Sequence, residues 1–375
     1  MSWEKVKLGE VTESCLGKML DQKKNKGSYK PYLANVNVRW GFFDLDNLQE
    51  MRFEDDEDEK YGIKYGDLII CEGGEPGRCA IWKEQIPNMK IQKALHRVRV
   101  HDIMDFRFVY YWFLLAGKQG ALKQYYTGAT IMHMPGQKLR EVLIDKPPLI
   151  VQQRIGAYLE TFDNLIENNQ KQIKLLEEAA QRLYKEWFVD LRFPGYENCK
   201  IVDGVPEGWS KAKVTDFLEV KYGKDHKALA DGNIPVYGSG GVMRYVKPIL
   251  YSGESVLIPR KGSLNNILLV SGDFWTIDTM FFSIPKLENV AKYTYLFLKG
   301  LDMYSFNIGA AVPSMTVKIL EGIDILHPTD TVLEQFERIT SPIFEMKTIL
   351  ERQIKEAEQA RDRLLPKLMT GELEV

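Results

Sequence analysis

The sequence predicts an α+β fold in which two mixed α/β domains are separated by two long helices that form an antiparallel coiled coil. The first observation is an internal repeat, since a tryptophan-led start occurs at Trp3 and again at Trp209, and each copy closes in a proline followed by a long charged helix. The second is the offset between matching residues: 206 for Trp3 and Trp209, 187 for Gly66 and Gly253, and 181 for Gly128 and Gly309. Because the offset then stays at 181 through the helices, a fixed pseudo-two-fold frame carries two divergent globular parts.

The composition is that of a globular protein with room for two or three domains: 375 residues, 45% hydrophobic and 27% charged. We divide the chain into a first domain at 1–146, a central helix at 147–190, a second domain at 191–327 and a C-terminal helix at 328–375. Neither globular part is broadly basic, because residues 1–146 hold 23 Lys and Arg against 21 Asp and Glu, and residues 199–328 hold 14 against 13. A nucleic-acid surface would therefore have to be local.

Cysteine usage and hydropathy indicate a cytoplasmic protein. Cys15, Cys71, Cys79 and Cys199 show no metal-binding spacing and are expected to be buried thiols in a reducing compartment. The N-terminus lacks an apolar signal core, and no uncharged stretch reaches the roughly 18 residues that a membrane span needs. The five histidines are scattered, so no metal site is expected.

Short strands are predicted in the same order in both globular parts. In the first, residues 67–71 are apolar, Gly73-Gly74 marks a turn, and residues 95–100 alternate apolar and polar side chains. In the second, residues 255–258 and 281–284 flank a turn at Gly262-Ser263. The acidic run at 54–59 is interpreted as a solvated loop that avoids phosphates.

An aromatic helix follows the strands in each copy, at 106–116 and at 291–299. Phe and Tyr recur there at helical spacing, which favours a helix that faces the core over an aromatic platform for DNA bases.

The long helices come next. Pro147-Pro148 starts a helix that runs to about 187, and its apolar positions alternate spacings of four and three residues, which is typical of a coiled-coil seam. We assign to this seam, as the coiled-coil and partner interface, Ile155, Leu159, Phe162, Ile166, Asn169, Ile173, Leu176 and Leu183, with Asn169 fixing the register. The C-terminal copy at 332–365 contributes Ile343, Leu350 and Leu364, and Pro342 is expected to interrupt its first turns. A long amphipathic helix lying on a domain is the alternative.

Motifs for catalysis are missing from the sequence. It has neither a phosphate-binding P-loop nor an HExxH zinc motif, and no glycine-rich fingerprint follows a strand. The segment Asp145-Lys146-Pro147-Pro148-Leu149 is similar to the acidic-Pro-Pro-aromatic motif of DNA amino-methyltransferases, but Lys146 separates the carboxylate from the prolines and Leu149 replaces the aromatic residue.

Cations and amides cluster near the predicted turns, and such groups are suited to phosphates and base edges. As candidate DNA-binding residues we select Lys24, Lys30, Asn35, Arg39, Gln92, Lys93 and Arg97 in the first domain and Lys224, His226, Tyr237, Ser239, Arg244, Arg260, Lys261 and Ser263 in the second. The turns at 127–130 and 309–312 occupy matched register and add Thr127 and Thr130. The alternatives are solvated surface charges and glycines needed only for backbone geometry.

Four segments resemble the DNA-specificity subunits of Type I restriction-modification systems, and the resemblance spans essentially the whole chain. They are the domain entry Val205-Pro206-Glu207-Gly208-Trp209, the helix entry Pro147-Pro148-Leu149-Ile150-Val151-Gln152-Gln153-Arg154-Ile155, the helix exit at 182–190 and the closing leucine-rich Thr-Gly segment at 364–373. The C-terminal helix departs from the pattern, because Leu333-Glu334-Gln335-Phe336 stands where the first copy has Gln152-Gln153-Arg154-Ile155.

The resemblance implies a noncatalytic DNA-recognition subunit with two target recognition domains, each reading half of a split double-stranded site. It implies that the helices set the gap between half-sites and dock two methyltransferase subunits, that restriction subunits join the full complex, and that S-adenosylmethionine, ATP and Mg²⁺ belong to those partners, with no cofactor in this chain. Two alternatives from other classes stay open: a self-sufficient methyltransferase with an unrecognised pocket, and a protein-only coiled-coil adaptor.

Overall fold

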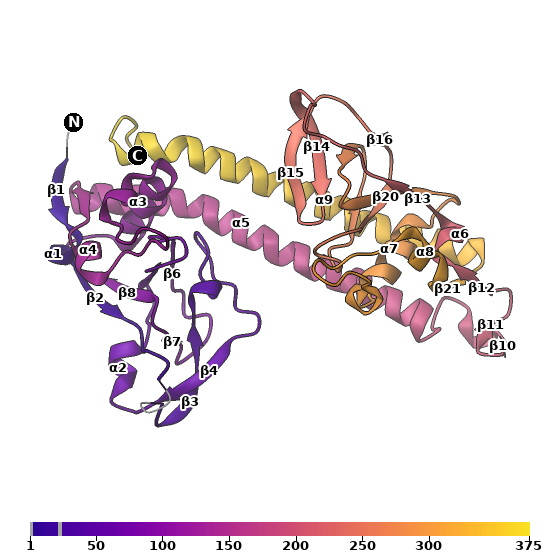
Figure 1. Cartoon of the computed structure of the whole chain (residues 1–375), viewed down its shortest axis with the longest axis horizontal. Helices are drawn as coiled ribbons and strands as arrows, with labels where there is room; N and C mark the ends of the chain where they lie inside the picture. The colour runs from indigo at the N-terminus through magenta and orange to yellow at the C-terminus, as the bar shows by residue number, and fades with distance from the viewer. Residues whose placement is uncertain (1–2, 22–24) are drawn as a thin grey trace. The chain divides into compact units, whose positions relative to one another are not determined.

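The computed structural model describes residues 3–21 and 25–375 of the chain. They form two compact units, the first made of Met1–Gln170 with Arg352–Val375 and the second of Lys171–Glu351. Each unit contains one α/β head and a stretch of both long helices (Figure 1). The predicted α+β class is confirmed. The division into four segments stays a prediction, since the unit boundary falls inside the helices.

The first head is built on an antiparallel sheet with the strand order β2-β8-β5-β6. Its strands are β2 (Thr12–Leu16), β8 (Leu95–Val100), β5 (Leu68–Cys71) and β6 (Cys79–Ile81). A second sheet, β4-β3-β7, consists of β4 (Gln49–Phe53), β3 (Ser28–Leu33) and β7 (Lys90–Ile91). The remaining elements are β1 (Glu4–Lys7), which pairs with β9 (Leu143–Lys146), α1 (Leu8–Val11), η1 (Asn35–Asn37), α2 (Glu57–Tyr61), α3 (Phe106–Gln119), η2 (Ala121–Tyr125) and α4 (Gly136–Arg140).

The second head repeats this plan. Its first sheet, β13-β20-β17-β18, consists of β13 (Leu218–Tyr222), β20 (Met280–Pro285), β17 (Ser255–Pro259) and β18 (Leu268–Val270). The second, β15-β14-β19-β16, consists of β15 (Gly241–Val246), β14 (Asp231–Gly238), β19 (Asp273–Thr276) and β16 (Tyr251–Ser252). The remaining elements are η4 (Tyr196–Asn198), β10 (Ile201–Val202) paired with β11 (Val205–Pro206), β12 (Ser210–Lys213) paired with β21 (Asp324–His327), α6 (Val214–Phe217), α7 (Ala291–Lys299), η5 (Met303–Phe306) and α8 (Val317–Gly322).

Helices α3 and α7 are the predicted aromatic helices, and both face the core. In α3, Phe108 and Phe113 are fully buried, and in α7 Tyr293 and Leu298 are buried as well. Each helix therefore provides an apolar face on which the head meets the long helices, and the prediction of a core-facing helix is confirmed.

The start of α3 is tied to the long helix by a buried glutamine. Gln152, with none of its surface exposed, accepts the backbone N–H of Asp105 at 2.9 Å and donates to the carbonyl of Pro147 at 2.8 Å. The repeat places Leu333 at this position in the second unit, where it packs in the apolar core with Phe336. The departure from the repeated pattern thus exchanges a polar tie for apolar packing.

The two long helices are α5 (Leu149–Tyr184), which continues into a π-helical turn η3 (Lys185–Val189), and α9 (Asp330–Met369). Helix α9 runs through Pro342 without a break, so the predicted interruption is wrong. The proline deprives only the carbonyl of Arg338 of its helical partner, and both residues are exposed, so that water can satisfy this carbonyl. None of the described helices is long and apolar enough to cross a membrane.

Within the first unit, the beginning of α5 pairs with the end of α9. Asn169 is 2% exposed and its amide donates to the side chain of Gln353 at 3.0 Å, while Asp163 pairs with Arg361 at 2.5 Å. Because the partner number rises as the α5 number falls, the helices are antiparallel. Farther along, Ile155 and Leu159 lie in the core of the head together with Leu365 and Leu368 of α9.

Within the second unit, the end of α5 pairs with the beginning of α9. Glu177 accepts a hydrogen bond from Lys347 at 2.6 Å, and Phe188 of the π-helical turn meets Phe336 with ring centroids 4.9 Å apart. The predicted seam residues are buried at Ile155, Leu159, Ile166, Asn169 and Leu350 and half-buried at Phe162, Ile173, Leu176, Leu183, Ile343 and Leu364. Within each unit, the seam therefore joins the two helices, and its residues also pack against the head of that unit.

Candidate nucleic-acid interface

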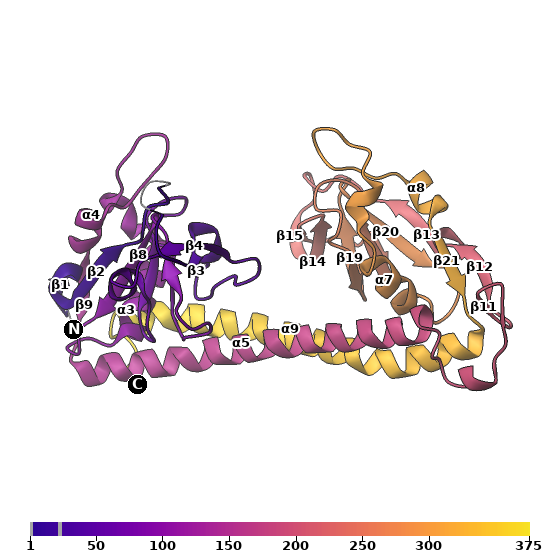
Figure 2. The same ribbon diagram turned by 90° about the horizontal axis from the view of Figure 1, so that it is seen from below.

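In the first head, the turn after strand β5 meets a hairpin loop, and we call residues 72–74 and 127–133 together the first loop edge. The backbone N–H of Glu72 donates to the carbonyl of Ala94 at 2.8 Å, and the carbonyl of Glu72 accepts from the N–H of Met134 at 2.7 Å. Thr127 and His133 close the loop by exchanging backbone hydrogen bonds of 2.7 and 2.9 Å. In Figure 2 the loop that leads into α4 projects from the side of the head opposite the helices.

In the second head, the turn after strand β17 meets a corresponding loop, and residues 260–262 and 308–314 form the second loop edge. The backbone N–H of Arg260 donates to the carbonyl of Thr279 at 2.8 Å, and the carbonyl of Arg260 accepts from the N–H of Met315 at 2.8 Å. The N–H of Ile308 donates to the carbonyl of Ser314 at 3.1 Å and closes the loop. The loop that leads into α8 projects from this head in the same way (Figure 2).

The two loop edges share their backbone construction. Gly74 and Gly262 both take a left-handed conformation, with φ of 73° and 85°, which a glycine adopts without steric cost. The residue before each of these glycines bridges to the hairpin, as the pairs Gly73 with His133 and Lys261 with Ser314 show. Position 72 is therefore equivalent to position 260, and the hairpins correspond at the offset of 181 that the sequence repeat has.

Several candidates predicted from the sequence lie at these edges. In the first head, Thr127 and Thr130 are exposed on the hairpin, and the Asn35 amide donates to the carbonyl of Gly73 at 2.6 Å. In the second head, Arg260, Lys261 and Ser263 lie in or beside the turn, and the carbonyl of Ser239 accepts from the Asn266 amide at 2.8 Å. These residues stay candidates for contacts with DNA.

Arg260 is held in a defined orientation. Its guanidinium donates to the carbonyl of Asp278 at 3.2 Å and lies over the ring of Tyr222, 5.3 Å from the centroid. Lys261 reaches the Asp278 carboxylate only at 3.8 Å. Because one hydrogen bond uses a small part of the five-donor guanidinium, Arg260 keeps donors for a ligand.

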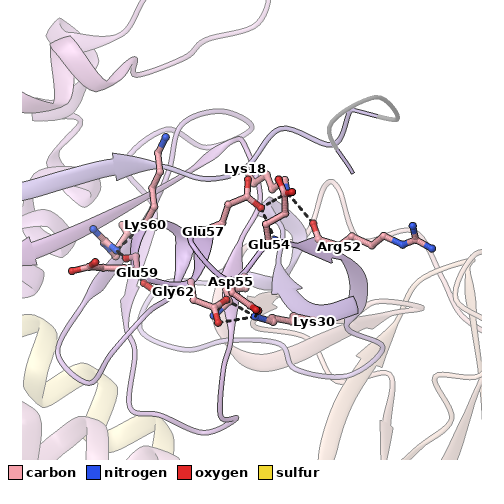
Figure 3. A network of polar contacts seen from close by, with 12 residues as sticks. Lys18, Lys30, Arg52, Glu54, Asp55, Glu57, Glu59, Lys60 and Gly62 are labelled. Atoms are coloured by element: carbon pink, nitrogen blue, oxygen red, sulfur yellow. Dashed lines mark hydrogen bonds and ion pairs between the residues drawn. The ribbon is translucent and has the colours of Figure 1, made fainter. Parts of the chain in front are cut away.

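Lys30 does not lie at a loop edge, because its ammonium group pairs with the acidic run at 54–59. Residues 54–56 of the run are exposed and not helical, as predicted, whereas residues 57–59 begin helix α2. The Lys30 ammonium contacts both carboxylate oxygens of Asp58 at 2.6 Å, and Lys18 pairs with Glu57 (Figure 3). Lys90, which is 3% exposed, reaches Asp58 at 3.1 Å. The hydrogen bond from Lys30 holds the pKa of Asp58 below its usual range. The prediction of a solvated loop is wrong only for Glu57 and Asp58, because the cations that pair with them, Lys18, Lys30 and Lys90, come from distant parts of the chain.

Arg97 is also part of this structural network, which contradicts its assignment as a DNA contact. It is 2% exposed, and its guanidinium donates to the carbonyls of Glu59, Lys60 and Gly62 at 2.9 to 3.1 Å and to the Glu13 carboxylate at 2.6 Å. A guanidinium enclosed in this way cannot reach a phosphate.

The other candidates of the first head are scattered. Lys93 is exposed and Gln92 half-buried in the turn before β8, and Arg39 lies 3.6 Å from the Asp44 carboxylate. Lys24 lies outside the described residues. The structure does not bring these side chains together.

Among the candidates on and beside the second sheet of the second head, Arg244 orders a loop. Arg244 donates to the carbonyl of Leu229 at 3.0 Å and to the Asp231 carboxylate at 2.5 Å. Tyr237 is half-buried against Phe274, and burial raises its pKa. Lys224 is exposed and His226 half-buried in the same segment. Arg244 therefore has a structural partner, and the other residues stay candidates.

Sequence analysis missed the carboxylate at the first loop edge and the apolar side chains of the hairpins. Glu72 is half-buried at the position of Arg260, and Ile131 and Ile308 are 65% and 64% exposed. A search for cations could not find them, because one is a carboxylate and the others are apolar. The constant offset of 181 from Gly128 onward indicated that the hairpins correspond, but it does not extend back to position 72. In residues 3–21 and 25–375, no group of three or more His, Cys, Asp or Glu could hold a metal ion.

A model of the Type I restriction modification DNA specificity domain matches residues 1–178 and 206–359. The specificity subunit of the Type I restriction enzyme MjaIX of Methanocaldococcus jannaschii is 28% identical in an alignment of 341 residues that covers 83% of this chain and 78% of that protein. The MjaVIII specificity subunit of the same organism is 23% identical, and the alignment covers 100% of this chain and 93% of that one.

A solved structure has the same fold. The crystal structure of a Type I restriction-modification S subunit from M. genitalium superposes with a TM-score of 0.60 at 18% identity, and the match covers 98% of this chain and 96% of that one. At this identity the likeness concerns the fold alone.

Proposed function

Since the chain belongs to the DNA-specificity family of Type I restriction-modification systems, we propose that each of its heads reads one half of a bipartite DNA site. The observation that carries this proposal is the pair of loop edges. In both, the residue after the strand donates its N–H to the residue before the neighbouring strand and accepts from the hairpin methionine, while the side chains differ, as expected of two readers built on one scaffold and directed at two base sequences. A loop that projects from a rigid sheet is suited to enter a groove of the duplex.

The loop edges supply the groups that such recognition needs. Arg260, Lys261 and Ser263 offer cationic and hydroxyl donors in the second head, and Thr127 and Thr130 offer hydroxyls in the first. Cations position a protein on phosphates, while hydroxyls and guanidinium groups also hydrogen-bond to base edges. The chain as a whole carries a net charge of −2, so that binding would depend on these local groups.

We assign the gap between half-sites and the docking of two methyltransferase subunits to the long helices. Apolar side chains are exposed on them at matched register: Tyr158 (40%) corresponds to Ile339 (43%), and Leu165 (44%) corresponds to Met346 (46%). Exposed apolar positions that recur along a helix are typical of a surface covered by a partner. Two equivalent surfaces favour two equivalent partners, which would bring S-adenosylmethionine, ATP and Mg²⁺, while restriction subunits complete the complex.

A methylated-base map of the host genome, made with the gene intact and with the gene deleted, tests this proposal. We expect one bipartite methylation motif to disappear on deletion and to return when the gene is restored. An unchanged map, with the neighbouring methyltransferase expressed, would contradict the proposal and favour the protein-only adaptor. Purified complex should also bind its site with an affinity that falls steeply with salt, as phosphate contacts require.

A further inference from the structure

The equivalence of positions 72 and 260 has a chemical consequence. Both residues directly follow an inner strand of a head, β5 or β17. Each donates its N–H to the carbonyl of the residue just before the neighbouring strand, Ala94 or Thr279, and accepts the N–H of the hairpin methionine through its own carbonyl. Because these three features fix the backbone, the side chains leave the two scaffolds at the same point. One of them is a carboxylate and the other a guanidinium.

Both side chains keep hydrogen-bonding capacity that contacts within the protein do not occupy. Glu72 is half-buried, and within the described part of the chain no hydrogen bond or ion pair engages its carboxylate. Arg260 spends one hydrogen bond on the Asp278 carbonyl and is stacked on Tyr222. In contrast, the neighbouring Glu75 pairs with Arg78 at 3.1 Å and accepts from the indole of Trp40 at 2.6 Å. Glu72 is thus an available acceptor, and Arg260 is an oriented donor.

We propose that Glu72 and Arg260 are base-reading residues of opposite polarity, Glu72 accepting from the exocyclic amino group of a cytosine and Arg260 donating to O6 and N7 of a guanine. This inference rests on the proposed function and deepens it. A carboxylate next to DNA is repelled by every phosphate, so at a groove-facing position it is stabilised only by a base that offers a donor. Guanine is the base that presents two acceptors to a forked guanidinium in the major groove.

The proposal predicts a different result for each head. In the assembled complex, Glu72→Ala should abolish discrimination at one base pair of one half-site, by about 10- to 100-fold, and leave the other half-site unchanged. Glu72→Gln should shift the preference at that base pair from cytosine to adenine, because an amide pairs with N6 and N7 of adenine. Arg260→Ala should relax one base pair of the other half-site by a similar factor.

Genome-wide methylation maps of hosts that carry each variant as the only copy of the gene measure this directly. Glu50→Gln serves as the matched control, because Glu50 is an exposed glutamate of the same head and lies outside the loop edge. Its motif should be that of the wild type. Thermal unfolding of each purified variant establishes that the fold is retained.

The possible results distinguish failure of this inference from failure of the proposed function. A wild-type motif that persists without change in the Glu72 variants would overturn this inference and leave the proposed function standing, as would a uniform loss of methylation at all sequences. A wild-type gene that specifies no motif at all would remove the proposed function and this inference together. Relaxation at a single base pair in each variant, in opposite half-sites, would support both.

Discussion

The polar contact between helix α5, helix α9 and the first head is an interaction whose loss can be measured. Asp163 accepts a hydrogen bond from the Tyr111 hydroxyl at 2.6 Å with one oxygen and pairs with the Arg361 guanidinium at 2.5 Å with the other. Tyr111 is 1% exposed, and the side chains of Arg361 and Asp163 are 15% and 22% exposed. Substituting Asp163→Ala would leave the buried Tyr111 phenol without its partner, and it would leave the mostly buried Arg361 guanidinium with Asp362, at 3.1 and 3.2 Å.

The expected cost is about 3 kcal/mol. Breaking a buried pair by removing one partner costs roughly 3–5 kcal/mol, and two features place the value at the lower end: the remaining solvent access of Arg361 and Asp163, and the pair that Arg361 keeps with Asp362. For a unit of about 200 residues, this corresponds to a fall in unfolding temperature of roughly 6–12 °C. The double-mutant cycle with Tyr111→Phe should give a coupling energy of about 1.5–3 kcal/mol, since the hydrogen bond involves a charged acceptor.

Differential scanning calorimetry of the full chain is the suitable assay, because the transition of one unit should move and that of the other should not. Glu178→Ala is the control: Glu178 and Arg182 lie 3.7 Å apart with side chains 45% and 83% exposed, and such a pair contributes about 0–1 kcal/mol. A decrease of less than about 1 kcal/mol in the free energy of unfolding for Asp163→Ala would refute the reasoning. It would mean that the pair is solvated or that Tyr111 and Arg361 form other contacts in its place.

Three further predictions concern the same elements. Burial, together with the charge of Asp163, raises the pKa of Tyr111. Stability should therefore fall as pH rises above about 10, where the phenol of the unfolded chain ionises. Tyr111→Phe should make this fall in unfolding temperature less steep. The pKa of Asp58 is lowered by Lys30, so its contribution is present above about pH 4 and lost below it, and Asp58→Asn should flatten that acid-side loss in a pH series of melting curves. Gly128 has φ of 101°, and a Cβ there would collide with the carbonyl oxygen of Ile131. Gly128→Ala should therefore weaken recognition of one half-site about tenfold, with little change in unfolding temperature. Equal weakening of both half-sites in a binding assay would contradict this prediction.

The frame of the molecule could be predicted from sequence because its signals are periodic. The spacing of four and three residues placed α5, and the constant offset of 181 placed α9 and both hairpins. Pro342 misled the prediction, because a proline rule that holds for isolated helices ignores that the freed carbonyl faces water. Local pattern and solvent exposure have to be considered together at such positions.

The interior of the heads could not be predicted because its order depends on pairs far apart in the chain. The acidic run looks solvated by composition, yet Lys18 and Lys90 approach it from other strands and order α2. The same electrostatics draws Lys30 and Arg97 away from the surface. A list of cations therefore overstates a binding site, since some of them are used to neutralise the protein's own carboxylates.

The bonds that place residues 72 and 260 come entirely from main-chain atoms. Such bonds do not depend on which side chain the residue carries, so a substitution at either position changes the chemistry presented by the loop without altering its path. Natural variation could replace one letter of a recognised sequence with another in a single mutational step and at little risk to folding. With residues 72 and 260 reading bases as proposed, the construction of the loop edges would allow this chain to acquire new specificities while the helices proposed to dock its partners stay the same.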